Sequence, residues 1–377
     1  MTLITYLTRI HFADGVLEDA LWSELESGKK RRPLIIADNE HMHGDLAERL
    51  LAGLPIKSRA ETYCDIPPIP TEHCARQIAD IYHESGCDVL LAFGTSRTID
   101  LAKVARVAIA HSGSIGRFTH KRGGSSRIGN ALPDLFAVPG ISGFGAAVSA
   151  HAPLVLKNGE RTLMMCKNLI PAVTICDPLL TVNATAEQSA SAGADAITHC
   201  VEAFLSKGYH PPADGIALDG LKRAMENLQP VLDNGGNIHA RREMMAASLN
   251  GALALQKGLG ACYAISNALE LVSDCELDQG GVNRIALPRV LRFNEDAVQE
   301  KFQALARTLK MRKQRNFVEG VERYFEKLPL PKLLSELGIG ASQINEAAVI
   351  ASSDLATDTN PKNIDTEDYL SIMRSVH

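Results

Sequence analysis

Short apolar runs alternate with amphipathic segments through the first half of the chain. Residues 33–38 (PLIIAD), 88–93 (DVLLAF) and 135–139 (LFAVP) have the length and composition of buried strands. The segments that connect them place apolar residues at helical spacing. Strands that alternate with helices predict a parallel sheet covered by helices, and therefore an α/β domain.

The pattern changes after Thr185. From there, apolar positions recur at helical spacing almost to the end of the chain, and no strand-like alternation persists. We expect roughly six to nine helices in this part of the chain. The sequence therefore predicts an α/β domain over residues 1–184 and an all-helical domain over residues 185–377.

Composition narrows the class of partner. Of 377 residues, 45% are hydrophobic and 22% are charged, which is ordinary for a soluble globular protein. The net charge of −5 provides no basic field for nucleic acid or anionic lipid. No stretch has the pattern of a secretion signal or a membrane span, so we expect a cytoplasmic protein that binds neither nucleic acid nor membranes. The 8 cysteines include no C-x-x-C pair and are expected to be reduced thiols.

One strand, turn and helix of the α/β domain has the geometry that binds a diphosphate. Residues 88–93 lead into GTSRTID (residues 94–100) and a helix, so backbone N–H groups at the turn can hold phosphate in a Rossmann-like arrangement. Asp38 ends an earlier strand, where its carboxylate can accept both hydroxyls of an adenosine ribose and repel a 2′-phosphate. In that role it favours NAD over NADP. A plain helix N-cap is the alternative use of Asp38.

Asp195, His199 and Glu202 lie four and three residues apart in a segment with helical periodicity. On an α-helix these offsets place the three side chains on one face, so two acids and an imidazole can converge. The alternative is an ordinary i,i+4 pair of Asp195 and His199 that is exposed to solvent. The spacing alone favours that alternative.

The surrounding sequence changes this interpretation. AVTICDP (172–178) and AGADAITHCVEAFLS (192–206) resemble the signature region of the iron-containing (group III) alcohol dehydrogenase family, and the resemblance extends over essentially the whole chain. It implies a Rossmann-like dinucleotide-binding domain followed by a helical domain, which is the dehydroquinate synthase-like plan. It also implies an NAD(P)-dependent oxidoreductase that acts on a small-molecule substrate and, as a family-level expectation, forms a homodimer.

The same resemblance implies a set of cofactor-binding residues. GTSRTID resembles the family's Gly-Gly-Gly-Ser-x-x-Asp motif, and LFAVPGISGFGAAVS resembles a second glycine-rich segment that closes over the cofactor. Most hydroxyl side chains of that second segment are missing here, so its contacts would come from main-chain N–H groups. The expected cofactor-binding residues are Asp38, Gly94, Thr95, Ser96, Arg97, Asp100, Lys103, Ser142, Gly143, Arg161 and Leu180.

In the family, the residues that match Asp195 and His199 bind a catalytic divalent metal together with two more histidines. Those two positions fall on Tyr263 and Gln279 in this chain, and a further histidine of the substrate pocket falls on Asn267. The resemblance thus implies a metal set of Asp195, His199 and Gln279, with iron or zinc as the metal. Neutral tyrosine and glutamine oxygens are weak donors to such metals.

Two uses of these residues remain open. Asp274, Glu276 and Asp278 could add oxygen ligands and complete a site for a harder cation. Alternatively, the site works without metal: Asp195 orients the imidazole of His199, which protonates or polarises a carbonyl oxygen.

The sequence therefore predicts hydride transfer between a nicotinamide and a small alcohol, aldehyde or keto substrate in the cleft between the two domains. The expected catalytic residues are His199, Asp195, Tyr263 and Asn267. One alternative is a metal-free reductase that resembles the maleylacetate reductases. Another is a nucleotide-binding pseudoenzyme whose catalytic site has decayed.

Overall fold

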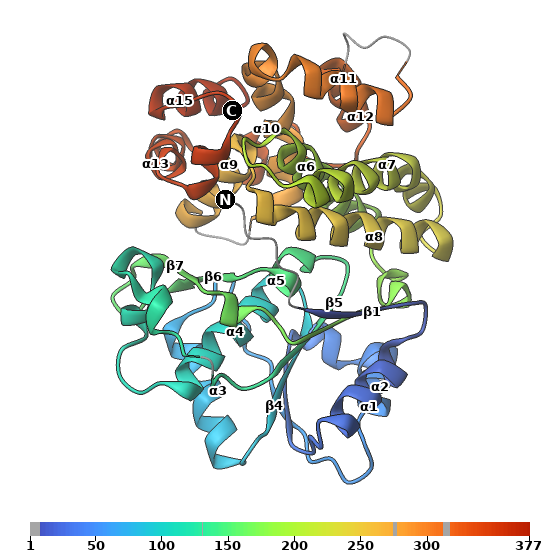
Figure 1. Cartoon of the computed structure of the whole chain (residues 1–377), viewed down its shortest axis with the longest axis vertical. Helices are drawn as coiled ribbons and strands as arrows, with labels where there is room; N and C mark the ends of the chain where they lie inside the picture. Colours follow the sequence, from blue (N-terminus) through green and yellow to red (C-terminus); the bar gives the residue numbers. More distant parts are fainter. Residues whose placement is uncertain (1–7, 130, 274–276, 312–316) are drawn as a thin grey trace. The chain divides into compact units, whose positions relative to one another are not determined.

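The computed structural model describes residues 8–129, 131–273, 277–311 and 317–377, and these form two compact units (Figure 1). One unit extends to Val182, and the other runs from Asn183 to His377. Each unit has its own hydrophobic core.

The first unit is built around a six-stranded parallel sheet. Its strands are β1 (Arg9–Phe12), β2 (Pro33–Ala37), β3 (Glu61–Tyr63), β4 (Val89–Gly94), β5 (Leu135–Pro139) and β8 (Val173–Cys176). Their order across the sheet is β1-β8-β5-β4-β2-β3, and neighbouring strands are parallel. The chain leaves β2 for the edge strand β3 and returns to β4 on the other side of β2. The carboxyl ends of β2 and β4 therefore flank a topological switch point, which is where open α/β sheets bind ligands.

Helices cover both faces of this sheet, which explains why β2, β4 and β5 are buried along their whole length. Figure 1 shows α1 and α2 beside one face and α3 and α4 beside the other. The helices of this unit are α1 (Leu17–Ser27), α2 (Gly44–Ala52), α3 (Glu72–Glu84), α4 (Ser96–Ala110) and α5 (Phe144–Val148). A separate antiparallel hairpin pairs β6 (His151–Val155) with β7 (Arg161–Met165).

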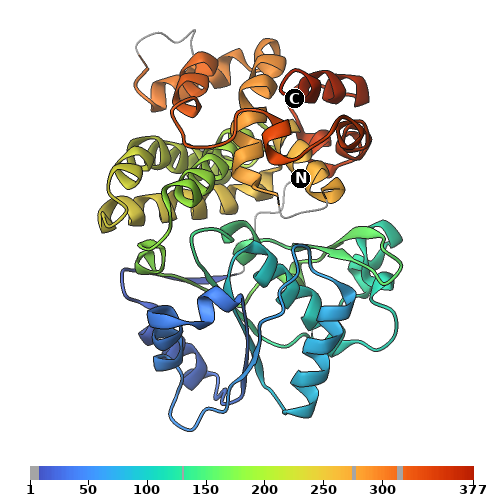
Figure 2. The same cartoon turned by 180° about the vertical axis from the view of Figure 1, so that it is seen from behind.

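The second unit is helical and is organised around α6 (Ala186–Leu205). The hydroxyl of Thr185 accepts from the N–H of Gln188, and the Gln188 side chain accepts from the N–H of Thr185, so a capping box fixes the start of α6. Figure 2 shows α7 and α8 side by side, and both pack against α6. The other helices of this unit are α7 (Pro211–Asp233), α8 (Ile238–Ala254), α9 (Ala261–Val272), α10 (Gln279–Asn294), α11 (Gln299–Thr308), α12 (Phe317–Phe325), α13 (Ala341–Ser352), α14 (Leu355–Thr359) and α15 (Thr366–Arg374).

The predicted fold class is confirmed, because a parallel α/β unit precedes a helical unit. The cysteines that the structure describes are free thiols, and Cys275 lies outside the described residues. Within the described ranges, none of the helices combines the length and the hydropathy needed to cross a bilayer.

Candidate active site

The predicted phosphate-binding turn connects β4 to α4 and is built on close approach of main chain. Gly94 has φ +145°, and a Cβ there would lie 2.9 Å from Oδ2 of Asp38. Gly143, with φ +99°, belongs to the second glycine-rich turn, where a Cβ would lie 3.0 Å from the backbone N of Ser96. Only glycine fits either position, because both need a left-handed backbone and both contact main chain or a buried carboxylate. The two glycine-rich segments therefore meet at the start of α4.

The start of α4 has polar groups to offer a ligand. Thr95 precedes the helix, but its side chain makes no capping hydrogen bond. Its Oγ1 is buried and has no hydrogen-bond partner among the described residues. The N-terminus of a long helix carries unpaired N–H groups and a partial positive charge, both of which favour a phosphate. This turn fits the diphosphate of a dinucleotide.

Asp38 follows β2 directly and lies across the switch point from Gly94. Its Oδ2 accepts from Oγ1 of Thr98 at 2.8 Å, and its Oδ1 lies 3.0 Å from Nη2 of Arg97. The Asp38 side chain is 10% exposed and that of Arg97 is 25% exposed. Asp38 makes no side-chain hydrogen bond as an N-cap to the short helix that follows it. The carboxylate instead faces the phosphate-binding turn.

Asp100 and Lys103 form a buried ion pair inside the α/β unit. Nζ of Lys103 donates to Oδ1 of Asp100 at 3.0 Å, to Oγ of Ser149 at 3.2 Å and to the carbonyl of His151 at 2.9 Å. Burial raises the pKa of Asp100 and lowers the pKa of Lys103. Because the Lys103 side chain is 0% exposed, its ammonium group ties α4 to Ser149 and to the start of β6 and is not presented to solvent.

The remaining residues expected to bind cofactor lie in different surroundings. Ser96 and Ser142 are half-buried, Ser96 in the first glycine-rich turn and Ser142 in the second. Leu180 lies in the short helix that follows β8 and packs into the core of the α/β unit. Arg161 is exposed at the start of β7.

In the helical unit, α6 holds Asp195 and His199 one turn apart. Nδ1 of His199 lies 3.5 Å from Oδ2 of Asp195, and Nδ2 of Asn283 donates to Oδ1 of Asp195 at 2.8 Å. The imidazole is 10% exposed and the carboxylate 33% exposed, so this is not an ordinary solvated surface pair. Burial raises the pKa of Asp195, whereas the imidazole and the Asn283 amide act in the opposite direction. The carboxylate is placed to orient the imidazole through Nδ1.

Glu202 lies on the same helix, three residues after His199, and holds the start of a second helix. Its carboxylate accepts from the backbone N–H groups of Gly260, Cys262 and Tyr263 at 3.3, 2.7 and 3.0 Å. Burial raises its pKa to about 7. Glu202 therefore caps the N-terminus of α9, and the cap fixes the helix on which Tyr263 lies.

The sequence predicts three polar residues near the Asp195–His199 pair, namely Tyr263, Asn267 and Gln279. Each makes a different contact in the structure. The rings of Tyr263 and His199 have centroids 5.7 Å apart. Asn267 donates from Nδ2 to Oδ2 of Asp354 at 3.2 Å, so its amide is held by the cap of α14. The Gln279 amide donates to Glu270 at 2.5 Å. Tyr263 therefore contacts the imidazole, whereas the amides of Asn267 and Gln279 are paired with other carboxylates.

The described donors do not fit an iron or zinc centre. Among the residues that the structure describes, no group of three or more His, Cys, Asp or Glu side chains is arranged to hold a metal ion. His210 lies later in the chain, but its Nδ1 accepts from the N–H of Ala213 and caps α7. Asp278 accepts a hydrogen bond from Ser191, while Asp274 and Glu276 lie outside the described residues. One carboxylate and one imidazole do not match the three or four ligands that these metals take.

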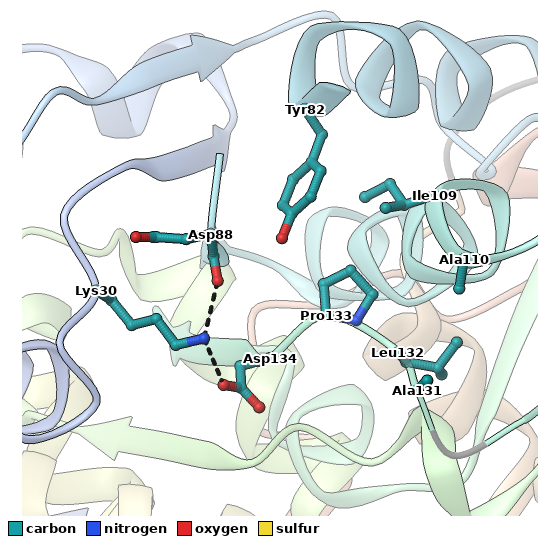
Figure 3. Close-up of a pocket in the computed structure, with 9 residues that line it drawn as sticks. All are labelled: Lys30, Tyr82, Asp88, Ile109, Ala110, Ala131, Leu132, Pro133 and Asp134. Atoms are coloured by element: carbon teal, nitrogen blue, oxygen red, sulfur yellow. Dashed lines mark hydrogen bonds and ion pairs between the residues drawn. The ribbon is translucent and has the colours of Figure 1, made fainter. Parts of the chain in front are cut away.

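A hollow of about 460 Å³ lies elsewhere in the α/β unit (Figure 3). Asp88 and Asp134 immediately precede β4 and β5, and Lys30 lies three residues before β2, so the hollow lies at the amino ends of these strands. Lys30 bridges the Asp88 carbonyl and the Asp134 carboxylate at 3.0 Å each. The hollow contains none of the predicted site residues, and it lies at the edge of the sheet opposite the phosphate-binding turn.

Comparisons with known proteins give the enzyme class. A family model of iron-containing alcohol dehydrogenases matches residues 8–178, and the model of the C-terminal region of the same family matches residues 189–377. The chain belongs to the iron-containing alcohol dehydrogenase family. It is an alcohol dehydrogenase-like oxidoreductase, as the sequence predicted.

Relatives in the iron-containing alcohol dehydrogenase family cover most of the chain. The 4-hydroxybutyrate dehydrogenase of Cupriavidus necator is 35% identical over 379 residues, which is 98% of each chain. The NAD-dependent methanol dehydrogenase of Bacillus methanolicus is 26% identical and covers 82% of each chain. The crystal structure of sulfoacetaldehyde reductase from Bifidobacterium kashiwanohense in complex with NAD+ superposes with a TM-score of 0.89 at 21% identity, over 100% of this chain and 98% of that one.

Sequence reasoning missed several polar contacts of this iron-containing alcohol dehydrogenase family member. The pairing of Asp38 with Arg97 joins residues 59 positions apart, and that of Asp195 with Asn283 joins residues 88 positions apart. Asn283 is 1% exposed within the apolar run of α10. A buried amide needs a polar partner, so the position of Asn283 among apolar residues could have indicated a hydrogen bond to a distant polar side chain.

Proposed function

We propose that the chain is an NAD-dependent dehydrogenase that interconverts a small primary alcohol bearing a carboxylate with the corresponding aldehyde. The substrate class is supported by the 4-hydroxybutyrate dehydrogenase relative, which is similar over 98% of both chains. The cofactor is supported by the turn before α4, where Thr95 makes no capping hydrogen bond, and by the relative named as an NAD-dependent methanol dehydrogenase.

The observation that carries the proposal is the Asp195–His199 pair. The carboxylate contacts Nδ1 of His199 and is itself held by Asn283. This arrangement orients the ring through Nδ1, so Nε2 can carry the proton exchanged with a substrate oxygen. In aldehyde reduction Nε2 donates that proton as negative charge develops on the oxygen. In alcohol oxidation it accepts the hydroxyl proton.

The bound nicotinamide would supply or accept the hydride at the substrate carbon. The residues of the chain supply position and proton transfer. Asp195 stabilises the positive charge that forms on His199 during oxidation, and it does not need to change protonation itself. Tyr263, whose ring contacts the imidazole, helps to exclude water from the pair.

We also propose that two of the family's metal-ligand positions are altered, at Tyr263 and Gln279, and that the reaction proceeds without a bound divalent metal. Support comes from the donor set: Asp195 and His199 are the strong donors of the expected set, and the Gln279 amide pairs with Glu270. The polarising role then falls to His199. The competing reading is a catalytically inactive nucleotide-binding protein, which the same replacements favour.

The experiment is an activity assay on purified wild type and His199→Asn. Oxidation is measured with 4-hydroxybutyrate and NAD+, and reduction with the corresponding aldehyde, succinic semialdehyde, and NADH. The expected result is activity in wild type and a loss of roughly 10²- to 10⁴-fold in the variant, the range of general acid-base contributions. His239→Asn is the matched control, because His239 is exposed on α8.

Full activity of His199→Asn would refute the assignment of His199. NADH binding without turnover of any hydroxy acid or aldehyde tested would favour the inactive nucleotide-binding protein.

A further inference from the structure

The acidic residue expected to select NAD is already paired with a guanidinium. Arg97 contacts Oδ1 of Asp38 at 3.0 Å, while the Thr98 hydroxyl holds Oδ2 at 2.8 Å. Arg97 and Thr98 both lie in the first turn of α4, so the helix that is expected to hold the phosphates also holds the carboxylate. The net charge of the Asp38–Arg97 pair is zero.

This pairing changes what the adenosine end of a dinucleotide would meet. An isolated carboxylate at this place accepts the ribose hydroxyls and repels a 2′-phosphate, which makes a site selective for NAD. An arginine near the same place is the group that accommodates the 2′-phosphate of NADP. Here both groups are present and in contact.

The surroundings keep the pair in place and add an imidazole beside the carboxylate. Asp38 cannot turn away freely, because the side chain is buried and Gly94 packs against it at a distance that leaves no room for a Cβ. Nδ1 of His41 lies 3.9 Å from Oδ2 of Asp38, and its ring packs edge-on against Phe93 with centroids 5.1 Å apart. Arg97, with 25% of its side chain exposed, is the member of the pair that can reach a ligand.

Given the dinucleotide binding proposed above, we propose that the chain accepts the 2′-phosphorylated dinucleotide as well as NAD, and that Arg97 is the residue that admits the phosphate. With NAD, Arg97 keeps its ion pair with Asp38, and the remaining lone pairs of the carboxylate oxygens accept hydrogen bonds from the ribose hydroxyls. With NADP, the guanidinium turns from the carboxylate to the phosphate, for which its planar fork is equally suited. Asp38 then retains its hydrogen bond from Thr98.

The test is a comparison of dissociation constants for NADH and NADPH in wild type, Arg97→Gln and Arg97→Lys. Adenosine 2′,5′-bisphosphate and AMP serve as competitors that report on the adenosine end alone, with no hydride transfer. Wild type is expected to bind the two dinucleotides within about tenfold of each other. Arg97→Gln is expected to shift the ratio of the two affinities against NADPH by roughly 10- to 100-fold, because it removes a charge-assisted hydrogen bond and leaves Asp38 unneutralised. Arg97→Lys should recover part of the shift, since it keeps the charge but not the fork.

Arg59→Gln is the matched control, because Arg59 is exposed on the same unit, and the ratio should not change. Asp38→Asn provides a second variant if Arg97→Gln does not fold, and it should shift the ratio toward NADPH.

The outcomes separate this proposal from the one on which it rests. Wild type that binds NADH and discriminates against NADPH by more than about 100-fold overturns the role of Arg97 and leaves the dehydrogenase proposal intact. An unchanged ratio in Arg97→Gln does the same. Wild type that binds neither dinucleotide overturns both proposals.

Discussion

Glu202 allows a quantitative prediction, because its carboxylate is buried and its hydrogen-bond partners are three backbone N–H groups at the start of α9. Burial raises its pKa from the ordinary value of 4.5 to about 7. In the unfolded chain the carboxyl titrates near 4.5. Between these two values the folded chain binds more protons than the unfolded chain, so the free energy of unfolding falls as the pH rises across this window.

The magnitude follows from the size of the pKa change. One pH unit of difference between folded and unfolded chain is worth about 1.4 kcal/mol, so the rise to about 7 corresponds to about 3 kcal/mol. Most of this falls between pH 4.5 and about pH 7. Glu202→Gln removes the titration and keeps one acceptor oxygen. Glu202→Ala also removes the acceptor and leaves three buried N–H groups unpaired, which costs roughly 3–5 kcal/mol.

The assay is denaturant unfolding of wild type and Glu202→Gln over this pH range, in which circular dichroism monitors the loss of helix. The advantage of wild type over Glu202→Gln is expected to shrink by about 2–3 kcal/mol from the acidic to the alkaline end. Subtracting the two curves cancels the titration of other buried acids. A difference that stays flat with pH, or that grows as the pH rises, would refute the reasoning.

Three other substitutions test close contacts at the phosphate-binding turn and beside α6. Gly94→Ala should weaken NADH binding by roughly tenfold or more, because the new Cβ would displace the carboxylate at the end of β2; Gly159→Ala, also at positive φ but with open space around it, is the control, with NADH titration as the measurement. Gly280→Ala should destabilise the helical unit by about 1–3 kcal/mol, because its Cβ would lie 2.1 Å from a carbonyl oxygen of α6, whereas Gly215→Ala in α7 has open space and should not; thermal unfolding distinguishes them. Asn283→Ala should lower kcat by roughly tenfold through loss of its hydrogen bond to Asp195, with the Kd for NADH unchanged.

The fold was predictable because its signals are local. The apolar runs that form β2, β4 and β5 are buried on both faces, and a strand buried on both faces has a continuous apolar pattern. The capping box at Thr185 and Gln188 likewise lies within four residues of sequence. Such features are visible before the chain is folded.

The chemistry of the site was predictable only in part. The i,i+4 pairing of Asp195 with His199 is a local signal and is present in the structure. Lys103 was expected to bind cofactor; the structure adds three hydrogen bonds from its ammonium group to oxygens of the α/β unit, and its cofactor role stays a prediction. Glu202 follows His199 by three residues in α6, as predicted, but its role as the cap of α9, whose N-terminus lies 58 residues further along the chain, was not predicted. Contacts of this kind depend on how distant elements pack, which periodicity does not encode.

We propose above that the Asp195–His199 pair, without a divalent metal, carries the proton in an oxidoreductase reaction. The most direct measurement is kcat for semialdehyde reduction by protein dialysed against a strong chelator, with residual metal quantified by elemental analysis. We expect kcat to be retained with substoichiometric metal and not to increase when Fe²⁺ or Zn²⁺ is added. Activity that disappears on chelation and returns with one equivalent of either metal would contradict it.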